Sequence, residues 1–229
     1  MTELSILMPV YDERATVQTA VERVLAADLP VDGLEIVLVD DGSTDGTREV
    51  IDGAAWPETV RRFHHPRNEG KGAALRTALG HAQGRWSCIV DADLEYDPAD
   101  LAQLLPPLQA GDADAVFGVR GFQSHSAYGF WYVLGNKAVT LAANVLYDAW
   151  LSDIMTCHKL MSTELFRSLR LREPGFAIEP EITARLLRSG VRVYEVPVTY
   201  RARSREAGKK LTSADGFRVL RTLARCRVD

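Results

Sequence analysis

The chain is poor in cysteine and has no long apolar run. Its 229 residues include three cysteines, widely separated at Cys88, Cys157 and Cys226, a pattern that excludes a disulfide framework and a zinc-site spacing and favours a reducing compartment. No stretch reaches the roughly eighteen apolar residues that a membrane-spanning helix requires. The N-terminal segment MTELSILMPVYDER lacks the basic start and long apolar centre of a signal peptide. We therefore expect a cytoplasmic chain.

Two nucleotide-binding signatures and an excess of positive charge are also missing. The apolar run at residues 4–10 is followed neither by G-x-G-x-x-G nor by G-x-x-x-x-G-K-[ST], so hydride transfer and phosphate-loop ATP hydrolysis are not indicated. The formal net charge is -4, and we expect no nucleic-acid partner. The length fits one domain, residues 1–229.

What is present is an alternation of strand and helix patterns. The sequence predicts strands within residues 4–10, 34–43, 59–66 and 85–98, and helices over about 15–26, 45–54 and 70–84. Ser43 or Thr44 is the expected cap of the second helix. This alternation of apolar strands with helices predicts an α/β fold, with a mostly parallel sheet and helices on both faces.

Polar side chains gather where three of these strands end. Ligands of such sheets bind at the carboxyl ends of the strands, so the sequence predicts one site built from three clusters: Tyr11-Asp12-Glu13, Asp40-Asp41-Gly42-Ser43 and Asp91-Ala92-Asp93.

The third cluster belongs to the stretch IVDADLEYDP, residues 89–98, which has acidic side chains at alternate positions. One interpretation is a solvated turn. The other is a metal site, because crowded carboxylates repel one another unless a cation lies among them. Carboxylates cannot bind a diphosphate directly, but they can do so through a hard cation such as Mg²⁺ or Mn²⁺.

Four motifs carry a family resemblance. PVYDER, LVDDGSTDGT, NEGKGAALRTAL and DADLEYDP, in this order, resemble family 2 glycosyltransferases. They are most similar to the polyprenyl-phosphate (dolichol-phosphate) mannosyl and glucosyl synthases without transmembrane helices, which have a GT-A (Rossmann-like) fold. The likeness covers roughly residues 4–212. It implies a nucleotide-sugar-binding half at about 1–120, an acceptor-binding half at about 121–212 and a basic C-terminal helix at about 213–229.

The resemblance also implies residues for the nucleotide sugar. Asp40 or Asp41 would accept a hydrogen bond from the ring N–H of the base, and the sequence does not decide between them. Lys71 would lie near the nucleotide, although a solvated lysine at the start of a helix is the alternative. The remaining implied contacts are Pro9, Tyr11 and Glu13 around the nucleoside, and Asp91, Ala92 and Lys210 nearer the phosphates.

The implied metal ligands lie in the third cluster. Asp91 and Asp93 form a D-x-D pair that would hold Mg²⁺ or Mn²⁺, with Asp93 the firmer ligand. Glu95 would be a further oxygen ligand, at a position where several relatives have glutamine.

The other implied catalytic residues are basic. Arg120 of GVR would approach the acceptor phosphate, while Arg203 and Lys209, followed by Lys210, would lie over the two phosphate groups. Together with Asp93 these residues form the predicted catalytic set, since basic side chains must bring two anions together.

The expected reaction is inverting transfer of a sugar from a GDP- or UDP-sugar to a polyprenyl or dolichyl phosphate. A phosphate monoester is a dianion at neutral pH and needs no general base. A hydroxyl acceptor, such as a saccharide, would need a carboxylate base, for which Glu179 and Glu181 are the candidates; both also suit the N-terminus of a helix. A sugar nucleotidyltransferase would need a glycine-rich loop after the first strand, and a non-catalytic sensor would lack the D-x-D or the basic loop.

Two segments point to a membrane surface. Residues 121–153 are dense in aromatic and aliphatic side chains, which fits either a core helix or a surface that receives a lipid chain. Arg218, Arg221 and Arg225 recur at helical spacing as a basic stripe. We therefore expect peripheral placement on the inner face of the cell membrane, with a membrane protein as a further expected partner.

Overall fold

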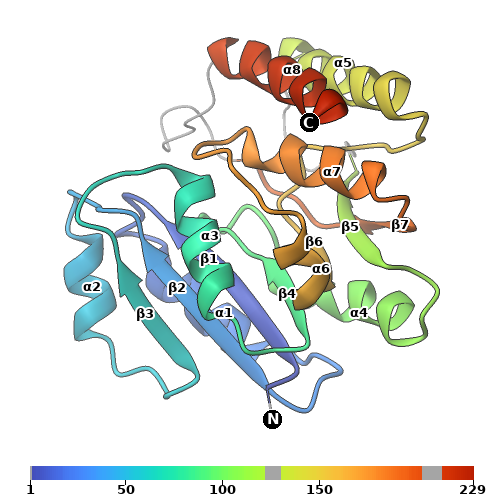
Figure 1. The fold of residues 1–229 in the computed structure, drawn as a ribbon. Coiled ribbons are helices and arrows are strands. Elements are labelled where there is room, and N and C mark those ends of the chain that lie inside the picture. The colour runs from blue at the N-terminus through green and yellow to red at the C-terminus, as the bar shows by residue number, and fades with distance from the viewer. Residues whose placement is uncertain (1, 122–129, 203–212) are drawn as a thin grey trace.

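The structure is a computed structural model that describes residues 2–121, 130–202 and 213–229. A sheet of seven strands runs through it in the order β3-β2-β1-β4-β6-β5-β7 (Figure 1). Strand β6 is antiparallel to both of its neighbours, and the other described pairs are parallel. The strands are β1 (Leu4–Val10), β2 (Leu34–Asp40), β3 (Val60–His64), β4 (Trp86–Ile89), β5 (Ala115–Arg120), β6 (Lys159–Ser162) and β7 (Val193–Val198).

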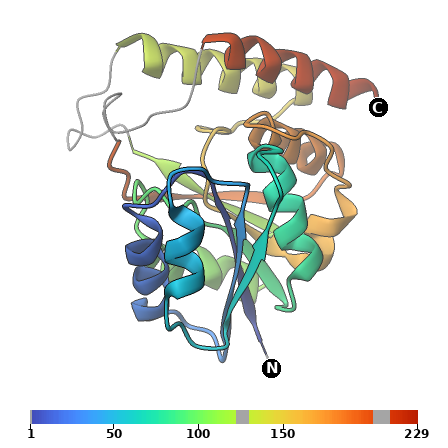
Figure 2. The same ribbon diagram turned by 90° about the vertical axis from the view of Figure 1, so that its left-hand side faces the viewer.

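Helices cover both faces of this sheet, as the sequence predicts. Figure 2 shows α1 and α2 on one side of the sheet and α3 on the other, while α5 and α8 lie side by side across one end of the molecule. The helices are α1 (Val17–Ala26), α2 (Thr47–Gly53), α3 (Lys71–His81), α4 (Leu101–Gln109), α5 (Phe130–Tyr147), α6 (Thr163–Ser168), α7 (Ile178–Arg188) and α8 (Ser213–Val228), with a short 3₁₀ turn, η1 (Pro98–Asp100), before α4. No helix in the described part of the chain is long and apolar enough to cross a membrane.

The sheet supplies the core because its central strands are apolar on both faces. All seven residues of β1 are buried, and so are six of the seven in β2, as expected for parallel strands covered by helices on each side. The register pairs Val10 with Asp40 and Leu7 with Ile89. Strands β1, β2 and β4 therefore end at the same edge, which brings the three polar clusters together.

The first two clusters are joined by hydrogen bonds. The Asp12 amide donates to Ser43 Oγ at 3.0 Å, and the Thr44 amide donates to Asp12 Oδ1 at 2.8 Å. The expectation that Ser43 or Thr44 caps α2 is therefore wrong. Helix α2 begins after Gly46, whose φ is 94°, and no side chain of that residue can cap it. The cross-strand contact with Asp12 engages Ser43 and Thr44 instead.

Candidate active site

A pocket of about 470 Å³ opens where strands β1, β2 and β4 end. It is also lined by residues of β5, α3 and α7. Arg203, Lys209 and Lys210 lie outside the described residues. Of the predicted site residues that the structure does describe, all but Asp40 line this pocket: Pro9, Tyr11, Glu13, Asp41, Lys71, Asp91, Ala92, Asp93, Glu95 and Arg120.

The structure separates the two adjacent aspartates at the end of β2. Asp40 is fully buried and accepts hydrogen bonds from Arg48 Nε at 3.1 Å and from the Ser43 amide at 3.0 Å. Burial raises the pKa of Asp40, but its hydrogen bonds outweigh burial and lower the pKa below its ordinary value. Asp40 thus stabilises the loop, and Asp41 is the one that faces the pocket.

Two glycines place Lys71 at the start of α3. Gly70 has a φ of 98°, in the left-handed region that favours glycine. A Cβ at Gly72 would lie 2.1 Å from the carbonyl oxygen of Glu173, so only glycine allows α3 to pack this closely on the segment before α7. The EGKG sequence therefore fixes the helix start against the pocket wall.

Lys71 lines the pocket and is not a solvated lysine. Its side chain is 12% exposed, and Nζ lies 2.8 Å from Asp91 Oδ2 and 3.0 Å from Glu179 Oε1. Burial lowers the pKa of Lys71, but Asp91 and Glu179 outweigh burial and hold it well above its ordinary value. Burial raises the pKa of Asp91, but the Lys71 ammonium and the neighbouring Cys157 and His158 together outweigh burial and lower this pKa below its ordinary value. Both groups are therefore charged at neutral pH.

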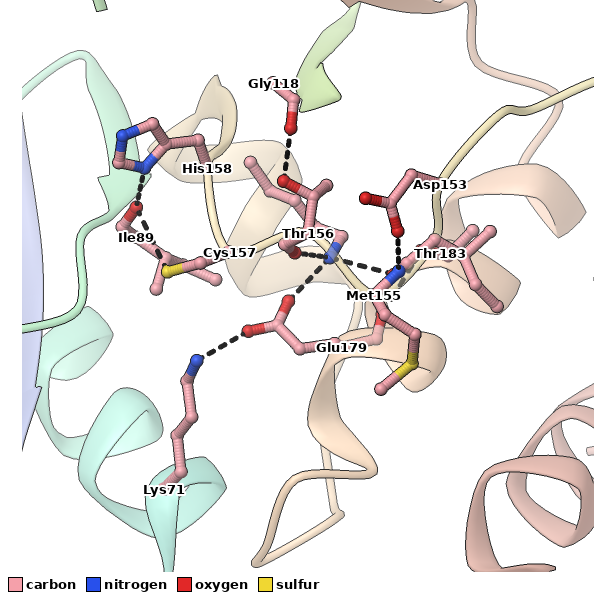
Figure 3. Close-up of polar contacts among 12 residues, drawn as sticks. Lys71, Ile89, Gly118, Asp153, Met155, Thr156, Cys157, His158, Glu179 and Thr183 are labelled. Carbon is pink, nitrogen blue, oxygen red and sulfur yellow. Dashed lines mark hydrogen bonds and ion pairs between the residues drawn. The ribbon is translucent and has the colours of Figure 1, made fainter. Parts of the chain in front are cut away.

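Glu179 joins Lys71 to a second buried lysine. Figure 3 shows its carboxylate pointing toward Lys71. Its other oxygen, Oε2, accepts from Lys159 Nζ at 2.6 Å, and Lys159 is fully buried. Lys159 Nζ also donates to the carbonyl oxygens of Ile154 and Thr156. The result is a buried line of alternating charge: Asp91, Lys71, Glu179 and Lys159. The sequence analysis does not identify Lys159 as part of this cluster. The one sequence feature that points to it is a lysine at the start of a short apolar strand.

This arrangement bears on the two candidate bases. Each oxygen of Glu179 faces an ammonium group, so its negative charge balances two lysines. Glu181 is buried outside the pocket lining, where it accepts from the amides of Arg172 and Glu173 and pairs with Arg185. Both glutamates do lie in the first turn of α7. Their contacts suit structural roles better than proton transfer from an acceptor.

The predicted metal ligands Asp91, Asp93 and Glu95 all line the pocket. Asp93 Oδ1 accepts from the Glu95 amide at 3.0 Å, and Glu95 Oε2 accepts from the Tyr200 hydroxyl. Among the described residues, no three histidine, cysteine, aspartate or glutamate side chains are arranged to hold a metal by themselves. A hard cation bound by one or two carboxylates and by substrate phosphate oxygens still fits this donor set, because Mg²⁺ is usually bound in that way.

Arg120 lines the pocket as a member of a buried ion pair. Its Nε and Nη2 donate to the two carboxylate oxygens of Asp153 at 2.6 and 2.9 Å. Its guanidinium carbon lies 5.1 Å from the centre of the Tyr200 ring. Burial raises the pKa of Asp153, but Arg120, the Met155 amide and the charge of Lys159 together outweigh burial and lower this pKa below its ordinary value. Much of the positive charge of Arg120 is thus balanced by Asp153.

The comparison with known families identifies the family of the chain. The profile of glycosyl transferase family 2 matches residues 5–170, which include the three strand-end clusters. The chain belongs to this family. Members of this family are glycosyl transferases.

Two similar curated proteins are a glycosyltransferase and a polyprenyl-phosphate sugar synthase. The chain is 31% identical over 198 residues to glycosyltransferase AglJ of Haloferax volcanii, covering 85% of this chain and 62% of that one. It is 29% identical over 229 residues to a dodecaprenyl-phosphate galacturonate synthase of Rhizobium johnstonii, covering 95% of this chain and 64% of that one. The chain thus spans less than two thirds of the length of either relative.

A solved structure shows the same fold with ligands bound. Glucosyl-3-phosphoglycerate synthase from Mycobacterium tuberculosis, in complex with Mn²⁺, UDP and glucosyl-3-phosphoglycerate, is 25% identical. It superposes with a TM-score of 0.71 over 100% of this chain and 81% of that one. The expected GT-A-like fold is therefore confirmed.

Proposed function

We propose that the pocket binds a nucleoside-diphosphate sugar and transfers the sugar, with inversion, to a polyprenyl or dolichyl phosphate. The observation that carries this proposal is the convergence of Asp41, Asp91 and Asp93 on one pocket, together with the engagement of Glu179 by two lysines. The carboxylates suit the nucleobase and a metal-bound diphosphate. No general base is required if the acceptor is itself an anion.

Asp91 and Asp93 are the proposed ligands of Mg²⁺ or Mn²⁺, with Glu95 beside them. The bound cation would neutralise charge on the leaving diphosphate. Lys71 holds Asp91 in place and adds a positive charge at the edge of the same pocket. The complex of the solved synthase with Mn²⁺ and UDP supports this proposal.

The acceptor step follows from the chemistry of a phosphate dianion. An acceptor oxygen attacks the anomeric carbon from the face opposite the diphosphate, and the new carbon–oxygen bond forms as the bond to the diphosphate breaks. The electron pair leaves with the nucleoside diphosphate, and the sugar is inverted. Arg120 lies at the pocket wall, where its side chain is proposed to approach the acceptor phosphate. The dodecaprenyl-phosphate relative supports a polyprenyl acceptor.

The α5–α8 helix pair supports placement of this reaction at a membrane surface. Helix α5 exposes Phe130, Leu134, Leu141 and Val145, and α8 exposes Phe217 and Leu220. Arg218 and Arg221 are exposed on α8, and basic residues favour anionic lipid surfaces. The predicted basic stripe is corrected at Arg225, because Arg225 forms an ion pair with Glu173 in which Nη2 lies 2.6 Å from Oε1. We propose the same helix pair as the binding surface for a membrane protein partner.

A transfer assay tests the proposed function. The chain is incubated with labelled nucleotide sugars, Mg²⁺ and polyprenyl phosphate in anionic vesicles, and the label is followed into the organic phase. We expect transfer to the lipid, and co-sedimentation with the vesicles that weakens as salt rises. Parallel incubations contain soluble saccharides. Transfer to a saccharide without transfer to the lipid would contradict the proposed acceptor, and absence of sedimentation at low salt would contradict the membrane placement.

A further inference from the structure

The carboxylate of Asp41 is already engaged by three hydrogen-bond donors. His65 Nδ1 lies 2.7 Å from Oδ1, and the Glu69 amide donates to the same oxygen at 3.0 Å. The Gly70 amide donates to Oδ2 at 2.7 Å. Asp41 is 2% exposed, yet it lines the pocket. Its remaining capacity to accept hydrogen bonds therefore determines which base it can bind.

A count of lone pairs gives that capacity. An ionised carboxylate has about four acceptor positions, two on each oxygen. Both positions on Oδ1 are taken by His65 and Glu69, and one position on Oδ2 is taken by Gly70. One acceptor position is left, on Oδ2. Asp41 can thus accept one further N–H donor, but not two donors side by side.

The nucleobases uracil and guanine differ in the number of N–H donors that they present to Asp41. Uracil presents a single ring N–H between two carbonyl oxygens. Guanine presents a ring N–H beside an exocyclic amino N–H, and this pair matches both oxygens of one carboxylate. With Oδ1 filled, the amino group of guanine would be left without its partner, which is costly in a buried site.

We propose that this pocket selects uridine over guanosine nucleotides, and that His65 is the positioning residue behind the selection. This inference rests on the proposed function, because it assumes that the pocket binds a nucleoside diphosphate. His65 is held in turn by Thr77, whose Oγ1 lies 2.9 Å from His65 Nε2. The ring is therefore fixed with Nδ1 toward Asp41, and it occupies the position on Oδ1 that guanine would need.

Calorimetric titration with UDP and GDP in the presence of Mg²⁺ tests this inference. We expect the full chain to bind UDP at least about tenfold more tightly than GDP, since an unpaired buried donor costs roughly that much. His65→Leu frees a position on Oδ1, so the preference should shrink by several-fold. His64→Leu is the matched control, because this neighbouring histidine contacts Asp40 and should leave the preference unchanged.

The three possible results have different consequences for the selection of uridine, for the role of His65 and for the proposed function. Equal or tighter binding of GDP by the unmodified chain would overturn the selection of uridine and leave the proposed function standing. A preference for UDP that persists in a folded His65→Leu variant would overturn the role of His65. Absence of binding by either nucleotide would overturn both this inference and the proposed function. The comparison within the unmodified chain stands even if a variant does not fold.

Discussion

Replacement of Asp93 by asparagine is expected to lower the rate of sugar transfer by at least about a hundredfold, the usual scale for loss of a group that stabilises developing charge. Asparagine has the same shape and keeps the acceptor for the Glu95 amide, so the fold should survive. The charge that holds a cation against the diphosphate is lost. Asp91 cannot replace it fully, because its carboxylate is shared with Lys71.

Initial rates over a range of Mg²⁺ and Mn²⁺ concentrations measure this effect. Excess chelator should reduce the unmodified chain to the same low rate. Asp112→Asn is the matched control, since Asp112 is exposed in the turn after α4. This variant should transfer sugar at the normal rate. A near-normal rate for Asp93→Asn, or full activity in chelator, would remove the metal from the account.

Glu179→Gln is expected to lower the free energy of unfolding by about 3 kcal/mol, because removal of one member of a buried charge cluster leaves its partners uncompensated. Lys159 is fully buried, and Glu179 is its only carboxylate partner among the described residues. Lys71 would retain its ion pair with Asp91 but lose the one with Glu179. We expect transfer to fall as well, because Lys71 loses one of the two groups that position it.

Urea denaturation of single and double variants separates this positioning role from general-base catalysis. Lys159→Met in the Glu179→Gln background removes the uncompensated ammonium and should restore part of the lost stability, which gives a large coupling energy. A base role predicts another outcome: Glu179→Gln would keep its stability while turnover is abolished. That result would favour a hydroxyl acceptor.

The fold and the pocket lining follow from local patterns in the sequence. The apolar side chains of residues 4–10 and 34–40 are enough by themselves to predict two buried strands. Parallel strands that end at one edge then bring together the residues that follow them. For this reason the sequence predicts one site for Tyr11, Asp41 and Asp93, and all three line one pocket in the structure.

The contacts within the site depend on pairings that sequence patterns do not show. Adjacent residues at a strand end point in different directions, so the pattern leaves open whether Asp40 or Asp41 faces the pocket. Lys159 and Glu179 are 20 residues apart and meet only because β6 and α7 pack on the same core. Arg225 has the spacing of a solvated stripe, yet Glu173 lies within its reach.

The pH dependence of transfer tests most directly the central claim that an acceptor phosphate attacks without help from a protein base. With polyprenyl phosphate, the rate should rise with a midpoint near the second ionisation of a phosphate monoester, about pH 6, and then level off. A phosphonate analogue of the acceptor ionises at higher pH, and the midpoint should move upward with it. A midpoint that stays in place when the acceptor is changed would show that a group of the protein is titrating, and would contradict the account.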